Sequence, residues 1–340
     1  MNKVRVVVDG TGRVASSHLQ GATRSELVEI VGLVNHNVDK AKAMGEKFGI
    51  ENCFSTIEEA NEKIEFDAVD ICLPNFLHEE ETIKCANLKK HVLLEKPMAN
   101  TIEECERILK AAKDNGIKLM IGQSRRYFPA VLKSKDEAGE VKNIKAELYA
   151  YLEKAPTPWW NKEETAGGLM IPLWGNHIFD YIVYMMNEMP ESIYCKTQNL
   201  NGSWEGEDEV AIIMTFKGKR FANVSMSWST MFNAQKWNGE GKMLSSKDVR
   251  YQRFIMCDKG SLILDDETKL FVNGEVVFDE DDQTVNFKNQ YDEFAKAVIE
   301  DRKPLTDGEV GLWNVAIQNA CLLSAKENKV VYLKGEYNYE

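Results

Sequence analysis

One stretch near the start of the chain, VRVVVDGTGRVA at residues 4–15, decides the fold of its first part. The first half of this stretch is rich in β-branched residues, which favour a strand. Gly10 permits a tight turn after the strand, and Gly12 lets the backbone approach a phosphate group closely. Ala15, in the place of a third glycine, still allows close packing of the next helix on the strand. The stretch therefore predicts a dinucleotide-binding turn, with the pyrophosphate at a helix N-terminus.

Alternating strands and helices follow this turn. We expect strands over residues 4–8, 28–34, 68–73, 92–94 and 118–121, and helices over residues 12–23, 39–48, 78–88 and 102–115. Strands that alternate with helices form parallel sheets with right-handed crossovers. Residues 1–122 are therefore predicted to form a Rossmann domain of the α/β class, with a doubly wound parallel sheet.

The pattern changes beyond residue 122. β-rich stretches follow one another at residues 146–152, 209–216, 222–227, 253–257, 261–264 and 269–271, with helices expected at residues 175–187, 291–300 and 309–328. Strands in series favour antiparallel pairing. We predict that residues 123–340 form an α+β domain around an open, largely antiparallel sheet, with the final helix as a candidate to pack back on the first domain.

The composition restricts the class of protein and its partners. A length of 340 residues suits two domains, and a hydrophobic fraction of 44% supports sizeable cores. The formal net charge of −12 disfavours nucleic acid and anionic membranes as partners. The seven cysteines are scattered without a CxxC pair, which is typical of reduced thiols and predicts no metal site. No charged-then-apolar leader precedes the first strand, so we expect a cytoplasmic protein.

The end of the second strand bears on the choice of cofactor. NAD-binding proteins usually carry an acid there for the adenosine ribose, and this chain has Asn35. An amide can bond to a ribose hydroxyl and does not repel a 2′-phosphate, which His36 and Arg13 are candidates to face. NAD and NADP therefore both stay open. Asp9 is unexpected, because its carboxylate would repel a pyrophosphate unless it points away.

Lys96 is the main catalytic candidate. It follows a short apolar strand in HVLLEKPM, residues 91–98, and open α/β sheets bind their ligands at such strand ends. Alcohol oxidation needs a group that takes the hydroxyl proton, and this group works best with a pKa near the working pH. A positive nicotinamide ring and a dry cleft would both lower the pKa of Lys96. Pro97 fixes the turn that holds the lysine in place.

These motifs together resemble the Gfo/Idh/MocA family of NAD(P)-dependent oxidoreductases, whose members act mainly on sugars, inositols and related polyols. The similarity extends over nearly the whole chain. It rests on the turn at residues 10–15, Leu73-Pro74-Asn75 with His78, Glu95-Lys96-Pro97, GQSRRYFPA at residues 122–130, PWW at residues 158–160, Gly167-Gly168, Gly175-Asn176-His177 and PLTDG at residues 304–308.

The resemblance implies roles for individual residues. Lys96 would bind or deprotonate the reacting hydroxyl, with His177 as its partner or as the general base. The cofactor would contact Gly10, Thr11, Gly12, Arg13, Val14, Asn35, His36, Leu73, Pro74, Asn75, His78, Glu95, Lys96, Gln123 and Arg126. The substrate would contact Lys96, Arg125, Trp159, Trp160, Lys162, Trp174, Asn176 and His177. Aromatic faces pack on sugar rings, although core packing is expected of at least one tryptophan. The open sheet of the second domain would mediate a homodimer or homotetramer.

One position departs from the family pattern. An aspartate is common two residues before the glycine of the Gly-x-His motif, and here that position is Leu173. Either Lys96 and His177 suffice, or Asp180 or Glu163 replaces the carboxylate, or the reaction differs. The expected function is hydride transfer between a nicotinamide and a secondary alcohol or ketone of a sugar, cyclitol or related polyol. The alternatives are a cofactor-binding sensor or degenerate enzyme without turnover, and a transient-redox use of bound NAD.

Overall fold

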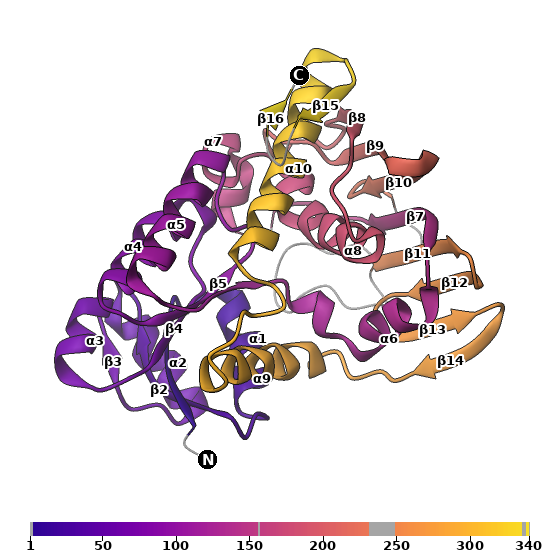
Figure 1. Cartoon of the computed structure of the whole chain (residues 1–340). Helices are drawn as coiled ribbons and strands as arrows, with labels where there is room; N and C mark the ends of the chain where they lie inside the picture. Colours follow the sequence, from indigo (N-terminus) through magenta and orange to yellow (C-terminus); the bar gives the residue numbers. More distant parts are fainter. Residues whose placement is uncertain (1–2, 156, 231–248, 335–337, 340) are drawn as a thin grey trace. The chain divides into compact units, whose positions relative to one another are not determined.

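The computed structural model describes residues 3–155, 157–230, 249–334 and 338–339 (Figure 1). Its chain divides into two compact units, Met1–Tyr127 with Gln283–Leu312 and Phe128–Asp282 with Trp313–Glu340. Within the described residues, every helix is too short or too polar to cross a bilayer.

The first unit is built on a six-stranded sheet in the order β3-β2-β1-β4-β5-β6. Every pair of neighbouring strands in this sheet is parallel, so the prediction of a parallel Rossmann sheet is confirmed. The strands are β1 (Val4–Asp9), β2 (Val28–Val34), β3 (Cys53–Phe54), β4 (Ala68–Ile71), β5 (His91–Glu95) and β6 (Leu119–Gly122).

The helices that connect these strands begin and end where the sequence signals are strong. They are α1 (Arg13–Ala22), α2 (Val38–Phe48), α3 (Ile57–Lys63), α4 (His78–Asn87) and α5 (Ile102–Asn115). A capping box between Thr101 and Glu104 opens α5, and Gly116 in the left-handed conformation (φ 66°) closes it. Such local signals explain why the predicted bounds of α5 agree with the observed ones.

A helix from late in the chain completes the first unit. Helix α9 (Val285–Ile299) packs against α1 (Figure 1) and contributes Tyr291 and Phe294 to the core that also holds Val6 and Leu93. The expected division at residue 122 assigned all of residues 123–340 to the second domain. The observed units divide the chain differently, because the apolar face of α9 is buried in the first unit.

The second unit contains a ten-stranded sheet in the order β14-β13-β12-β11-β7-β10-β9-β8-β15-β16. Its pairs are antiparallel except for β10 with β7, which confirms a largely antiparallel sheet. Its strands are β7 (Val141–Ala150), β8 (Ser192–Gln198), β9 (Glu209–Phe216), β10 (Arg220–Ser227), β11 (Val249–Cys257), β12 (Gly260–Asp265), β13 (Lys269–Val272), β14 (Glu275–Asp279), β15 (Val331–Lys334) and β16 (Asn338–Tyr339).

Helices α6 (Pro129–Ala138) and α8 (Asn176–Met186) pack on this sheet, and most of α10 (Gly308–Glu327) belongs to the same unit. Burial alternates along β9, so that one side of the strand faces the core and the other, which carries Ile213, faces solvent. Helix α6 was not predicted because its polar residues hide the helical period, and β8 was not predicted because its burial does not alternate regularly.

Candidate cofactor and catalytic site

The residues expected to bind a cofactor follow neighbouring strands of the parallel sheet. Asp9 pairs in register with Val34 of β2 and Ile71 of β4, and Ile71 pairs with Leu94 of β5. Because parallel strands all end at one edge of a sheet, the residues that follow them gather at this edge. They are residues 10–14, 35–36, 73–75, 96 and 123.

The two glycines of the first turn have different structural roles. Gly10 has a φ of +98°, and a Cβ atom there would lie 2.5 Å from the carbonyl oxygen of Cys72. Gly12 opens α1 without a side-chain cap, and a Cβ atom there would meet nothing within 4 Å. The first turn of α1 carries no acidic residue, so its N–H groups and its dipole favour an anion. The turn therefore fits the pyrophosphate of a dinucleotide.

Asp9 does not oppose this role. Its carboxyl group is 4% exposed and hydrogen-bonds to Glu81 of α4. Burial, followed by the neighbouring charge of Glu81, raises the pKa of Asp9 well above its ordinary value. A raised pKa favours the uncharged carboxylic acid, which repels a phosphate less than a carboxylate does.

The segment after β2 is ordered by its own amide. Nδ2 of Asn35 donates to the hydroxyl of Thr11 at 2.8 Å, and its Oδ1 accepts from the backbone N–H of Asn37 at 2.9 Å. His36 is exposed beside it. The position expected to read the adenosine ribose therefore carries no negative charge.

Lys96 stands directly after β5 and is half-buried. Burial lowers the pKa of Lys96 to about 8, against the opposing effect of the Glu95 carboxylate. The guanidinium groups of Arg125 and Arg13 lower it further, so both arginines lie within electrostatic reach of the amine. An amine with this pKa exchanges its proton readily near neutral pH, as a general base for alcohol oxidation must.

The side chains of three residues expected to contact the cofactor form hydrogen bonds within the protein. The ring nitrogens of His78 lie 2.8 Å from the carbonyl oxygen of Pro97 and 2.9 Å from that of Leu73. Oε1 of Glu95 forms a hydrogen bond with His18, and its Oε2 accepts from the backbone N–H of Lys96. Arg126 is buried and donates to the carbonyl oxygen of Leu305. The side chains of His78 and Glu95 are thus engaged within the protein, and their contact with a cofactor stays a prediction.

The other expected cofactor residues line the same edge in different degrees of exposure. Leu73 and Pro74 are half-buried, whereas Gln123 is 1% exposed. Asn75 is buried and donates from Nδ2 to Oδ1 of Asn100. Val14 is half-buried in the first turn of α1.

In the second unit the Gly-x-His motif forms the start of α8. His177 is half-buried, and its ring contacts that of Trp174 edge-on at 6.3 Å between centroids. Asn176, expected to bind substrate, is buried and donates to Oε1 of Gln318 on α10 at 3.0 Å. It joins two helices of the core because its position on α8 faces inward.

The tryptophans divide between packing and exposure. Trp160 is 9% exposed and stacks on Trp228 at 5.7 Å between ring centroids with an interplanar angle of 11°, so it packs in the core, as expected of at least one tryptophan. Trp159 and Trp174 are half-buried, and Lys162 is exposed. These three remain candidates for contact with a substrate.

Leu173 lies inside a π-helical turn, Ile171–Gly175, and is 4% exposed. The buried carboxyl group of Glu207 supports this turn by accepting from the backbone N–H groups of Leu169 and Ile171. Of the two candidate replacements for the missing carboxylate, Asp180 is buried on α8 and accepts from Asn314, and Glu163 is exposed at the start of α7 (Glu163–Ala166).

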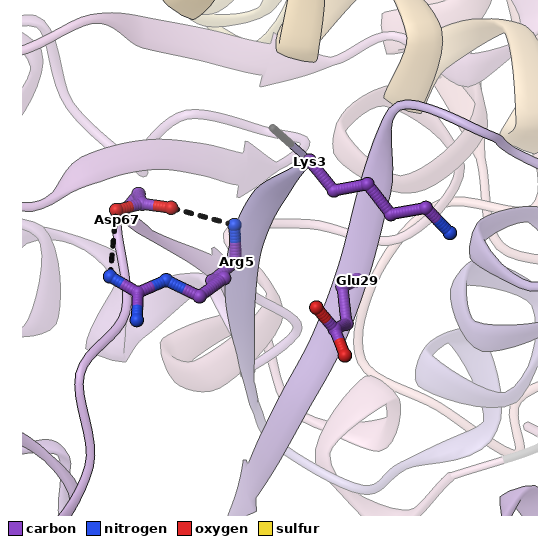
Figure 2. A pocket seen from close by; sticks show the side chains of 4 residues that line it. All are labelled: Lys3, Arg5, Glu29 and Asp67. Carbon is purple, nitrogen blue, oxygen red and sulfur yellow. Dashed lines mark hydrogen bonds and ion pairs between the residues drawn. The ribbon is translucent and has the colours of Figure 1, made fainter. Parts of the chain in front are cut away.

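A hollow at the other end of the parallel sheet is lined by Lys3, Arg5, Glu29 and Asp67 (Figure 2). Arg5 donates to Asp67 from its backbone N–H at 2.8 Å and from its guanidinium at 3.4 Å. These groups lie where the strands begin, the opposite end from the glycine turn. We interpret the hollow as a solvated set of ion pairs outside the candidate site.

Comparison with known proteins gives two matches to family models. An oxidoreductase family described as having an NAD-binding Rossmann fold matches residues 4–123, and the GFO/IDH/MocA C-terminal domain matches residues 132–263. Together they cover more than half of the chain.

Individual relatives agree with this result. An uncharacterized oxidoreductase of Streptococcus pneumoniae is 27% identical over 83% of this chain and 77% of its own length. The 1,5-anhydro-D-fructose reductase of Ensifer adhaerens is 24% identical over 93% of this chain and 94% of its own. A solved structure of levoglucosan dehydrogenase with NADH and L-sorbose covers 98% of this chain and 100% of its own, with a TM-score of 0.86 at 19% identity.

Proposed function

Because the chain belongs to the Gfo/Idh/MocA family of oxidoreductases, we propose that it transfers a hydride between NAD(P) and a secondary alcohol or ketone of a sugar, cyclitol or related polyol. The observation that carries the proposal is Lys96, an amine with a pKa lowered to about 8 at the edge of a parallel sheet that also carries the glycine turn. The names of two similar proteins, 1,5-anhydro-D-fructose reductase and levoglucosan dehydrogenase in complex with NADH and L-sorbose, support a carbohydrate substrate.

In this proposal each residue has a defined task. The bound cofactor would provide the nicotinamide ring that accepts the hydride in oxidation. Lys96 takes the hydroxyl proton as a free amine in oxidation and returns it as an ammonium in reduction. His177 binds the same hydroxyl or shares its proton. Trp159, Trp174 and Lys162 contact the substrate, together with Arg125.

The exposed face of the ten-stranded sheet is proposed as the contact between copies of this chain in a homodimer or homotetramer. It carries exposed apolar side chains on three strands, Ile213, Phe221 and Met256. The molar mass from light scattering tests this, and a monomer at micromolar concentration would contradict it.

The function itself is tested by titrating the protein with NADH and NADPH while following nicotinamide fluorescence, and then by assaying a polyol panel with the tighter cofactor. Saturable binding followed by substrate-dependent absorbance change at the nicotinamide band is expected. Failure of both cofactors to bind would contradict the assignment.

A second candidate function is a cofactor-binding protein without turnover. Leu173 favours it, because the family aspartate is replaced by a buried apolar side chain at this position. Binding of a nicotinamide cofactor with no turnover across the whole polyol panel would select this candidate over the dehydrogenase.

Replacing Asn35 with aspartate is expected to weaken NADPH binding about tenfold or more while leaving NADH binding within about threefold of the original, because a carboxylate near a 2′-phosphate is repelled by several kcal/mol before screening. An aspartate can still accept from the hydroxyl of Thr11 and from the backbone N–H of Asn37, so the loop is kept. Fluorescence titration with both cofactors measures the change.

The matched control is Asn37→Asp, which adds the same charge two residues away and keeps an N-cap acceptor for α2. Its effect on NADPH binding is expected to be the smaller of the two. Equal losses in both variants would indicate a general effect of charge and would contradict the role of Asn35.

A further inference from the structure

A buried polar cluster lies next to Lys96 in the first unit. Its members come from four elements: His18 from α1, Asp70 from β4, Glu95 from β5 and Tyr291 from α9. Nδ1 of His18 lies 2.8 Å from Oδ2 of Asp70, and Nε2 lies 3.0 Å from Oε1 of Glu95. The hydroxyl of Tyr291 donates to the same oxygen of Asp70. His18, Asp70 and Tyr291 are 0% exposed and Glu95 is 6% exposed.

The geometry determines the protonation of His18. Both of its ring nitrogens face carboxyl oxygens, and only an imidazolium donates from both nitrogens at once. Burial, the largest single effect, lowers the pKa of His18, but the charge and hydrogen bond of Asp70 together with the interactions of the neighbouring Cys72 more than offset it, so the pKa is raised well above its ordinary value. The neighbouring thiol of Cys72 stays neutral, because burial raises its pKa to about 12. Two carboxylates therefore hold one imidazolium in the interior.

The cluster continues to Lys96 through Glu95. Oε2 of Glu95 accepts from the backbone N–H of Lys96 at 3.1 Å, so both oxygens of this carboxylate are held. On the other side, His78 contacts the carbonyl oxygen of Pro97. The backbone around Lys96 is thus held at its own N–H group and at the carbonyl group of Pro97.

We propose that His18 is a positioning residue for Lys96 and acts through Glu95, whose carboxylate it orients and partly neutralises. The inference rests on the proposed role of Lys96 in hydride transfer and extends the site to a side chain that touches neither cofactor nor substrate. Asp70 and Tyr291 hold the imidazolium in turn.

The charges around Lys96 and Glu95 predict that replacing His18 and replacing Glu95 shift the pKa of Lys96 in opposite directions. The charged and titratable groups near Lys96 are Glu95, Arg125 and Arg13. Those around Glu95 and His18 are Asp70, Cys72, Tyr291 and His78. Without the imidazolium, Glu95 attracts the ammonium of Lys96 more strongly and raises its pKa. Without the charge of Glu95, the arginines dominate and the pKa of Lys96 falls.

The test compares the pH profiles of kcat/KM for polyol oxidation in wild type, His18→Gln and Glu95→Gln. The midpoint of the rise with pH is expected to move up by about half a unit to one unit in His18→Gln and down by a similar amount in Glu95→Gln. In both variants kcat falls about tenfold or more, while KM stays within about threefold, because the lysine is displaced but the substrate walls are kept.

The matched control is His91→Gln. His91 lies on β5, the strand that ends with Glu95, but at its other end, and it accepts from the backbone N–H of Lys118. The pH midpoint of kcat/KM and the kcat of this variant are expected to equal those of wild type. A folded His18→Gln protein with the wild-type midpoint, or with a midpoint moved down as in Glu95→Gln, would overturn the proposal.

Two measurements on the protein without cofactor keep the inference testable whatever the turnover. Competitive labelling of Lys96 with trace acetic anhydride reports the protonation midpoint of its amine in all three proteins, so a failed polyol assay and a failed inference are distinguishable. If His18→Gln does not fold, ¹⁵N spectra of the five histidines in wild type test the proposal through the protonation state of His18. An imidazolium signal from His18 that persists above pH 8 supports the proposal, and a His18 that becomes neutral near pH 6.5, the ordinary value, overturns it.

Discussion

Replacing Lys96 with methionine is expected to lower kcat/KM for polyol oxidation by about 100- to 10,000-fold, the usual contribution of a positioned general base. Methionine keeps an unbranched stem of similar length but carries no proton acceptor of useful basicity, so the fold and the cofactor turn are kept. The loss is measured by NADH formation at saturating cofactor, with NADH affinity determined separately by fluorescence.

The pH dependence gives this prediction a sign. The active form for oxidation is the free amine, and the pKa of Lys96 is lowered to about 8, so wild-type oxidation rises as the pH increases through about 8. Reduction needs the ammonium and falls over the same range. The residual activity of Lys96→Met is expected to lack this transition.

The control is Lys110→Met, which removes an exposed lysine that pairs with Asp114 on α5. Surface ion pairs of this kind contribute little, and its activity is expected to equal that of wild type. Turnover by Lys96→Met within a few fold of wild type, with the same pH profile, would remove Lys96 from the mechanism.

The glycine pair of the first turn gives the second large effect. Gly12→Ala is expected to weaken NAD(P)H binding about 10- to 100-fold, because a methyl group forced into a close contact costs about 1–3 kcal/mol and each 1.4 kcal/mol is about tenfold in affinity. The free energy of unfolding is expected to change by less than about 0.5 kcal/mol, as at other exposed sites. A Cβ atom at Gly12 meets nothing within 4 Å in the protein, and the residue is exposed.

Gly10→Ala is the matched variant, in which we expect the main loss to be in the free energy of unfolding. Its Cβ atom would lie 2.5 Å from a backbone oxygen, and its φ of +98° is unfavourable for alanine. The expected cost is about 2–5 kcal/mol of unfolding free energy, from backbone strain and overpacking together. Urea unfolding and fluorescence titration of both variants separate the two effects. Normal NADH binding by Gly12→Ala would show that the pyrophosphate does not lie over this glycine.

Much of the first unit was predictable because its signals are local. The strand, the two glycines and the following helix at residues 4–23 belong to one short stretch, and the capping box of α5 lies within four residues. Each of these features depends on backbone conformation and near neighbours, which the sequence displays directly. The positions of Lys96 and Asn35 at strand ends follow from the same alternation.

The roles of several site residues were not predictable in this way. Asn176 and Trp160 carry motif positions expected to face a substrate, yet they contact Gln318 and Trp228, which are distant in the sequence. Nothing in the local sequence distinguishes an amide that faces a ligand from one that joins two helices, since both are polar residues at a helix start.

The sequence by itself determined the parallel sheet, the nucleotide turn and the lysine at the end of β5, because strand periodicity and turn chemistry act over a few residues. Only the tertiary structure decided that His18 lies between Asp70 and Glu95, and that Tyr291 completes the cluster. Tyr291 is 221 residues from Asp70 in the sequence, and its helix joins the first unit because its apolar face gains burial there. Hydrophobic burial has no preferred direction. The whole fold, and not the local sequence, therefore decides which surface the helix packs against.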